Sequence, residues 1–110
     1  MDDPVARLER ERRETLKRLA YLSDDFAQVV AASYDSNADD EHDPEGATIA
    51  FERSQLGALA DQAQRRLTEI DAALERVAAG TYGSCERCHR PIAADRLHAR
   101  PVARTCTGCA

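Results

Sequence analysis

The stretch CERCHRPIAADRLHARPVARTCTGC, residues 85–109, holds every cysteine of the chain as two C-x-x-C pairs. Seventeen residues separate the two pairs. Two thiolates two residues apart can bind one ion from a tight turn, and a second such pair completes a tetrahedron. Four protein ligands leave no open position for water, so the pattern predicts one structural Zn²⁺ ion. The predicted ligands are Cys85, Cys88, Cys106 and Cys109.

Other uses of the cysteines fit the sequence less well. A thioredoxin-like motif needs a single C-x-x-C in a βαβ unit. The N-terminus, MDDPVARLERERR, lacks the apolar core of a signal peptide, and no apolar run could span a bilayer. We therefore expect a cytoplasmic protein, in which disulfides are rare. A thiol redox sensor that releases zinc is an alternative, and His89 and His98 are expected to lie outside the ligand set.

Upstream of the cysteines, two long segments repeat apolar or small side chains at steps of three and four. The first segment covers residues 5–34 and has one clear gap, at Arg12. In the second segment, the spacing from Leu56 onward is that of a heptad-like seam. Both patterns predict long amphipathic helices. The second stripe comprises Ile49, Leu56, Leu59, Ala63, Leu67, Ile70, Leu74 and Val77.

These patterns predict a mostly α fold, an antiparallel two-helix coiled-coil hairpin followed by a small C-terminal four-cysteine zinc finger. Pro4 and Pro44 favour helix starts, and Gly80 favours a left-handed cap after the second helix. Each helix would be about 50 Å long at 1.5 Å per residue. A homodimeric coiled coil is the structural alternative, but each stripe has a partner in the same chain, so we expect a monomer. The predicted domains are residues 1–79, with an acidic tip near 36–46, and residues 80–110.

The charge pattern argues against several classes of function. A net charge of −5 disfavours binding to DNA, RNA or a membrane surface. Residues 35–47, DSNADDEHDPEGA, carry six carboxylates and no Lys or Arg, whereas residues 85–110 hold five Arg against two acids. The chain shows no nucleophile–base pair, no phosphate-binding glycine loop and no ligand set with an open position, so we do not expect an enzyme.

Residues 80–109, GTYGSCERCHRPIAADRLHARPVARTCTGC, resemble the DksA/TraR family of four-cysteine zinc finger regulators. The likeness lies in the G-x-Y-G before the first cysteine, in Ile92, in R-L-x-A-R-P at 96–101 and in the family spacing of both cysteine pairs. The preceding hairpin with its acidic turn extends the likeness over most of the chain.

The resemblance implies a transcription regulator that binds bacterial RNA polymerase directly and does not bind DNA. In this family the coiled coil enters the secondary channel, and its acidic tip approaches the catalytic centre. Counted back from the first cysteine without a gap, the family's tip, D-x-x-D-x-A, falls on HDPEGA, residues 42–47. His42 then stands at the first Asp position, with Asp43 beside it. The tip residues that the resemblance implies are His42, Asp43, Glu45 and Ala47.

In this family the alarmone guanosine tetraphosphate can bind between the polymerase and basic residues near the finger. Arg100 matches the arginine of that region, but Glu69 and Ala110 stand where lysines are expected. We therefore expect no dependence on the alarmone. Arg96 and Arg100 are candidates for partner or alarmone contact, or they offset the negative charge of the zinc thiolates. The alternative function is a zinc-stabilised protein-interaction adaptor with a different partner.

Overall fold

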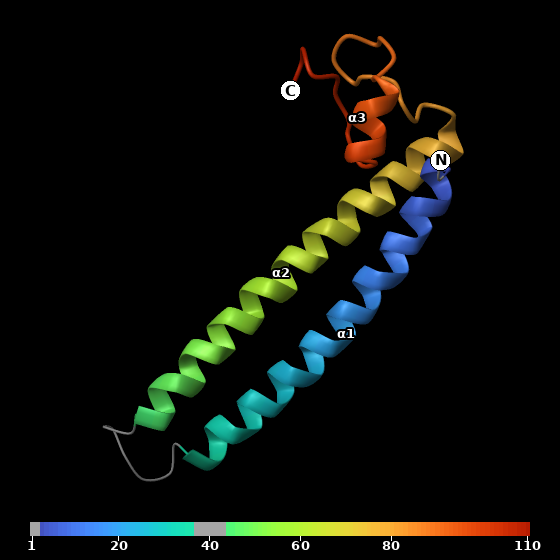
Figure 1. The fold of residues 1–110 in the computed structure, drawn as a ribbon. Helices are drawn as coiled ribbons and strands as arrows, with labels where there is room; N and C mark the ends of the chain where they lie inside the picture. Colours follow the sequence, from blue (N-terminus) through green and yellow to red (C-terminus); the bar gives the residue numbers. More distant parts are fainter. Residues whose placement is uncertain (1–2, 37–43) are drawn as a thin grey trace. The chain divides into compact units, whose positions relative to one another are not determined.

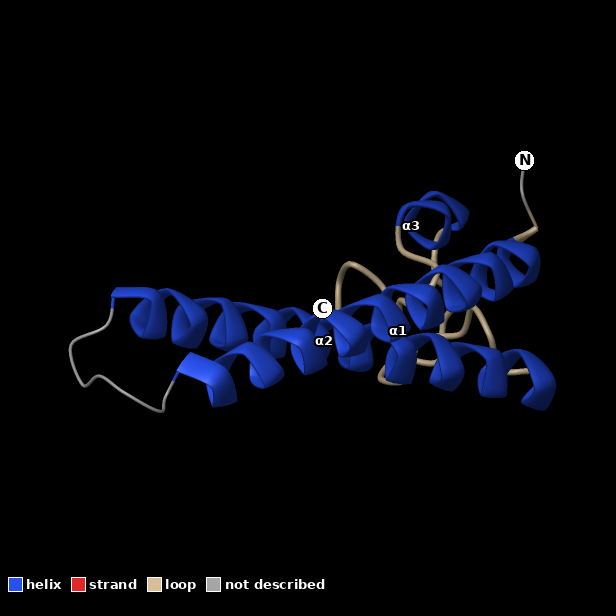
Figure 2. Cartoon of the chain, turned by 90° about the horizontal axis from the view of Figure 1, so that it is seen from below, coloured by secondary structure: helices blue, strands red, loops and turns tan. Residues whose placement is uncertain are grey.

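The computed structural model describes residues 3–36 and 44–110 (Figure 1). This described part forms the helices α1 (Pro4–Ser36), α2 (Pro44–Ala79) and α3 (Ala94–Ala99), and its β structure is one isolated bridge (Figure 2). The mostly α fold with two long helices packed together is thus confirmed. The chain divides into two compact units: unit 1 comprises Met1–Glu14 with Arg66–Ala110, and unit 2 comprises Thr15–Arg65. The division into domains at residues 79 and 80 stays a prediction.

The ends of the long helices carry the capping signals that the sequence contains. Asp3 caps α1, because its Oδ1 accepts a hydrogen bond from the Val5 N–H at 3.3 Å. After α2, Gly80 adopts a left-handed conformation with φ +76°. The Thr81 N–H then donates to the Arg76 carbonyl at 2.9 Å and the Gly80 N–H bonds to the last turn of α2, which together form a Schellman motif. The predicted glycine cap is confirmed.

Unit 1 has one apolar core to which three segments of the chain contribute. Leu8 of α1, Ile70 and Ala73 of α2, and Val102 beyond α3 are buried in it. Partly buried side chains pack around this cluster, namely Leu74, Val77 and Tyr82. In both views the start of α1 lies beside the last turns of α2 (Figures 1 and 2). The cysteine-bearing segment therefore shares its core with the base of the two helices.

Ion pairs join α1 and α2 beside this core. Arg12, the gap in the first apolar stripe, reaches Asp71 with an Nε–Oδ1 distance of 2.7 Å. Arg66 reaches Glu11 with an Nη2–Oε2 distance of 2.6 Å. Because these side chains are partly exposed, each pair contributes about 0.5 kcal/mol at most. These ion pairs favour one register of the two helices, because only in that register do the opposite charges meet.

Unit 2 contains the remaining turns of α1 and α2, and it buries fewer apolar side chains. Leu22 and Ala63 are buried there, at 8% and 5% exposure. Tyr21 and Phe51 are instead 74% and 69% exposed. None of the helices in the described ranges is both long enough and apolar enough to cross a membrane.

Candidate metal centre

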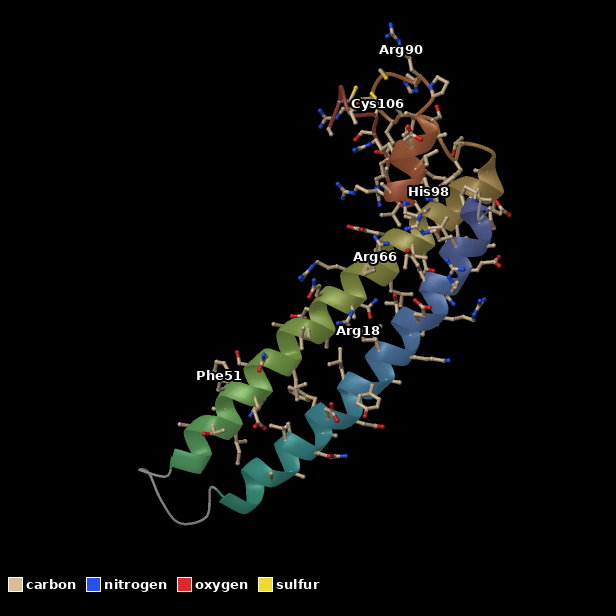
Figure 3. The ribbon with its side chains drawn as sticks, in the orientation of Figure 1. Arg18, Phe51, Arg66, Arg90, His98 and Cys106 are labelled. Atoms are coloured by element: carbon tan, nitrogen blue, oxygen red, sulfur yellow. The ribbon has the colours of Figure 1, made fainter. Side chains whose placement is uncertain are left out.

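The four predicted zinc ligands meet at one point in unit 1. The Sγ atoms of all four cysteines lie within 4.8 Å of one another. The Sγ atoms of Cys88 and Cys106 are 3.7 Å apart. Figure 3 shows the sulfur atoms gathered beside Cys106, within the finger loops. Within residues 3–36 and 44–110, the four thiols are the one cluster of three or more side chains able to hold a metal ion, and it includes no histidine.

The spacing of these sulfurs fits a tetrahedral ion. A Zn–S bond of about 2.3 Å places the sulfurs of a tetrahedral site about 3.8 Å apart. The measured 3.7 Å agrees with that edge, and it is far longer than a disulfide bond of about 2.0 Å. All four cysteines are free thiols. The centre therefore holds one structural zinc ion, with every coordination position supplied by protein.

The backbone builds a tight turn around the first cysteine pair. The Cys85 N–H donates to the Arg90 carbonyl at 2.9 Å, and the His89 N–H donates to the Cys85 carbonyl at 3.0 Å. His89 has φ +61°, so its backbone reverses the chain directly after the second ligand. Gly83, with φ +84°, brings the chain close to Leu97, whose Cδ1 would lie 3.5 Å from an added Cβ. His89 thus contributes through its backbone conformation while its side chain stays exposed.

The second cysteine pair is tied to the first by the backbone. The Cys109 N–H donates to the Cys106 carbonyl at 3.1 Å, which closes the second turn. The Glu86 N–H, inside the first loop, donates to the Arg104 carbonyl at 3.0 Å, just before the second pair. This bond brings two segments that are distant in sequence to the same ion.

Hydrogen bonds prepare part of the cluster for ligation. Backbone groups of Cys88 and Cys106 hydrogen-bond to the Cys85 sulfur and lower the pKa of Cys85 to about 6. Hydrogen bonds with Cys109 and Cys88 lower the pKa of Cys106. Bonding of the Cys109 thiol to Cys106 and Cys85 raises the pKa of Cys109 to about 12. The cluster therefore favours thiolate at the buried Cys85, and metal binding must displace the proton of Cys109, because only thiolates are ligands.

The two arginines suggested by the family resemblance occupy different environments. Arg96 of α3 is half-buried, and its Nε donates to the Thr105 carbonyl at 2.8 Å. It therefore holds the second cysteine loop in place. Arg100, just after α3, is exposed. A contact of either arginine with a partner or an alarmone stays a prediction.

Unit 1 contains a hollow of about 280 Å³. It is lined by the three residues from which we predicted that the protein does not depend on guanosine tetraphosphate. Glu69 of α2, Arg100 and Ala110 all line it. Glu69 also lies 3.7 Å from Arg66, measured from Oε2 to Nη1. The Glu69 carboxylate thus places a negative charge beside Arg100, where a lysine would add a positive one. The hollow is also lined by Arg96, Arg104 and Thr105.

The expected tip residues fall mostly beyond what the structure describes. His42, Asp43 and the side chain of Glu45 lie outside the described residues. Ala47 is exposed near the start of α2. The role of these four residues stays a prediction.

Three structural features of the finger were missed by sequence reasoning. Helix α3 has Asp95 in its first turn and His98 in its last, a charge order that favours a helix and could have revealed it. The His98 carbonyl accepts a hydrogen bond from Arg7 Nη1, which ties α3 to the start of α1. The Tyr82 hydroxyl donates to the Pro101 carbonyl at 2.8 Å. No local sequence signal marks either long-range contact.

This fold and this centre define a small four-cysteine zinc protein in which a finger is built onto the base of two long packed helices. The family model for the prokaryotic dksA/traR C4-type zinc finger matches residues 80–110. The finger is therefore of the DksA/TraR type.

Relatives extend the likeness beyond the finger. The structure of transcription factor DksA2 from Pseudomonas aeruginosa is similar with a TM-score of 0.59 and 27% identity, over 94% of this chain and 80% of that one. Protein YteA of Bacillus subtilis is 34% identical over 102 residues, which is 89% of this chain and 42% of YteA. The RNA polymerase-binding transcription factor DksA of Caulobacter vibrioides is 46% identical over 43 residues, 39% of this chain and 30% of that protein. The chain spans less than half the length of these two curated relatives.

Proposed function

We propose that this protein regulates transcription by binding bacterial RNA polymerase directly, with its two-helix hairpin inserted in the secondary channel. The observation that carries the proposal is the finger itself, a family-type zinc centre that shares the buried core of Leu8, Ile70 and Val102 with the base of the hairpin. The similarity to DksA2 over 94% of the chain supports the same arrangement of helices and finger. The polymerase-binding activity named for the Caulobacter relative supports the partner.

The geometry of a hairpin suits a narrow channel. Each helix is about 10–12 Å across with its side chains, a width that a narrow channel can admit. The acidic stretch of residues 35–47 covers the end of α1, the start of α2 and the sequence between them, and we propose that it enters the channel first. Carboxylates are preferred Mg²⁺ ligands and can also act on a magnesium-containing centre through charge. We propose that the tip residues His42, Asp43, Glu45 and Ala47 face the catalytic centre, and we assign the carboxylate role to Asp43 and Glu45.

We propose that unit 1 contacts the polymerase outside the channel. Zinc and Arg96 make the finger rigid, and the exposed Arg100 is available for contact with the polymerase. Binding to DNA is not part of the proposal, because the net charge of −5 would repel phosphates. We propose that regulation does not depend on guanosine tetraphosphate, because Glu69 and Ala110 stand where the resemblance implies lysines.

The test is transcription in vitro with the double variant Asp43→Ala/Glu45→Ala. It should bind polymerase as the wild type does and lose the effect on initiation. The matched control, Asp24→Ala/Asp61→Ala, removes two helix carboxylates that are exposed and should keep the effect. Equal activity of the tip variant and the wild type would show that the acidic segment is only a solvated connection.

A further inference from the structure

Unit 2 contains a groove of about 360 Å³ between its turns of α1 and α2. Its apolar lining consists of Val29 and Ala32 from α1 and of Ile49 and Leu56 from α2. Val29, Ile49 and Leu56 are only half-buried. The groove therefore presents apolar surface from both helices to whatever enters it.

The charged side chains that line this groove are both carboxylates, Asp25 and Glu52. The lining is completed by two amides, Gln28 and Gln55. A groove with an apolar floor and an acidic rim is complementary to an apolar side chain that is flanked by Lys or Arg.

The same flank carries further exposed apolar surface. Tyr21 lies one helical turn before Asp25 on the same face of α1 and is 74% exposed. Phe51 of α2 is also exposed, at 69%, but it points away from α1 in Figure 3 and lies off the groove. Exposed aromatic side chains are typical anchors of protein–protein interfaces.

The part of the sequence that contributes the groove residues is strongly acidic. Residues 24–56 contain nine carboxylates and a single basic side chain, Arg53, which gives −8. In a second copy of this chain the same residues also carry a net charge of −8. The two copies would repel each other, so self-association through the groove is disfavoured. A basic partner would be attracted to it and guided toward it.

We propose that this groove is a docking site for a Lys/Arg-rich segment of the polymerase that inserts one apolar side chain between α1 and α2. The inference rests on the proposed function, because it takes the occupant from the polymerase. It adds a contact along the side of the hairpin, distinct from the tip and from the finger. Asp25 and Glu52 would pair with the basic side chains while Val29, Ile49 and Leu56 would contact the apolar one.

The test compares two charge-matched variants for binding to purified bacterial core RNA polymerase. Asp25→Asn/Glu52→Gln removes the two groove carboxylates, and Asp24→Asn/Asp61→Asn removes two exposed helix carboxylates that do not line the groove. The groove variant should bind at least about tenfold more weakly, with a smaller dependence on salt, because it loses desolvated charge pairs. The control should change affinity little. All four positions are solvent-accessible, so both variants should fold, which circular dichroism checks.

Site-specific photocrosslinking identifies the occupant. Benzoylphenylalanine in place of Gln28 should crosslink to a basic polymerase peptide, whereas the same probe in place of Ala27, which does not line the groove, should not. If the wild type binds polymerase and the two double variants bind it with equal affinity, the groove proposal is overturned and the proposed function stays intact. Crosslinks to an acidic peptide, or to a second copy of the chain, would do the same. Failure of the wild type to bind polymerase would overturn both proposals.

Discussion

Leu8→Ala tests whether the zinc finger and the base of the hairpin fold together. Leu8 is fully buried against Ile70, Ala73 and Val102, so it contacts both α2 and the segment that carries the second cysteine pair. The substitution removes three carbons, about 2.4 kcal/mol at about 0.8 kcal/mol per buried methylene. The cavity left behind brings the loss in the free energy of unfolding to about 3 kcal/mol.

The same loss should appear in the zinc affinity. Zinc binding supplies folding energy to small metal domains, so destabilising the folded core weakens binding of the ion that requires it. A loss of about 3 kcal/mol corresponds to about a 100-fold weaker zinc affinity if the whole of unit 1 folds with the metal. The affinity is measured by competition with a chromophoric chelator, and the stability by urea unfolding followed by circular dichroism.

Leu22→Ala is the matched control, because Leu22 is nearly as buried but belongs to unit 2. It should cost about 2 kcal/mol of helix stability, since its surroundings are more open, and leave zinc affinity unchanged. Zinc affinity of Leu8→Ala within about twofold of the wild type, or 0.4 kcal/mol, would refute the shared-core reasoning. The finger would then be the independent domain, residues 80–110, that the sequence predicts.

Three further predictions concern the same unit and the helix ends. Tyr82→Phe should cost about 1 kcal/mol through loss of the bond to Pro101, and it should also remove a pH dependence of stability. Burial raises the pKa of Tyr82 above 10.0, so the native state favours the neutral phenol. The free energy of unfolding of the wild type should therefore fall as pH rises through 10.0, which urea unfolding at two pH values measures. A double-mutant cycle on Arg12 and Asp71 should give a coupling of about 0.5 kcal/mol that vanishes in 1 M salt, where the Debye length is about 3 Å; an unchanged value in salt would contradict a surface ion pair. Gly80→Ala should destabilise the protein by about 1 kcal/mol, because φ at this position is +76°. Gly57→Ala, inside α2 with open space at its Cβ position, should stabilise the protein by about 0.5 kcal/mol. Urea midpoints of the two variants that move in the same direction would contradict the capping argument.

Sequence reasoning succeeded where a local pattern determines the structure. Apolar steps of three and four predicted the two long helices, and Pro44 and Gly80 stand at the predicted boundaries of α2. The two C-x-x-C pairs predicted a four-sulfur cluster because only one tight turn is needed for each pair.

It failed where a structure depends on which residues meet across the fold. The sequence shows Arg12 as a gap in the apolar stripe. Its ion pair with Asp71 could not be predicted, because it depends on the register of the two helices. Arg96 was a candidate for contact with a partner or for offsetting thiolate charge, and its hydrogen bond to the Thr105 carbonyl depends on a contact that no local pattern indicates. The groove beside Val29 depends on how side chains of two helices pack, which no spacing within one helix reveals.

Binding of the zinc-loaded protein to purified bacterial core RNA polymerase, with a known secondary-channel factor as competitor, is the decisive experiment. The account predicts saturable binding that the competitor displaces, because both proteins would occupy the same channel. Binding that the competitor leaves unchanged would place the protein elsewhere on the polymerase. Absence of binding by folded, zinc-loaded protein would contradict the proposed function and favour an adaptor with a different partner.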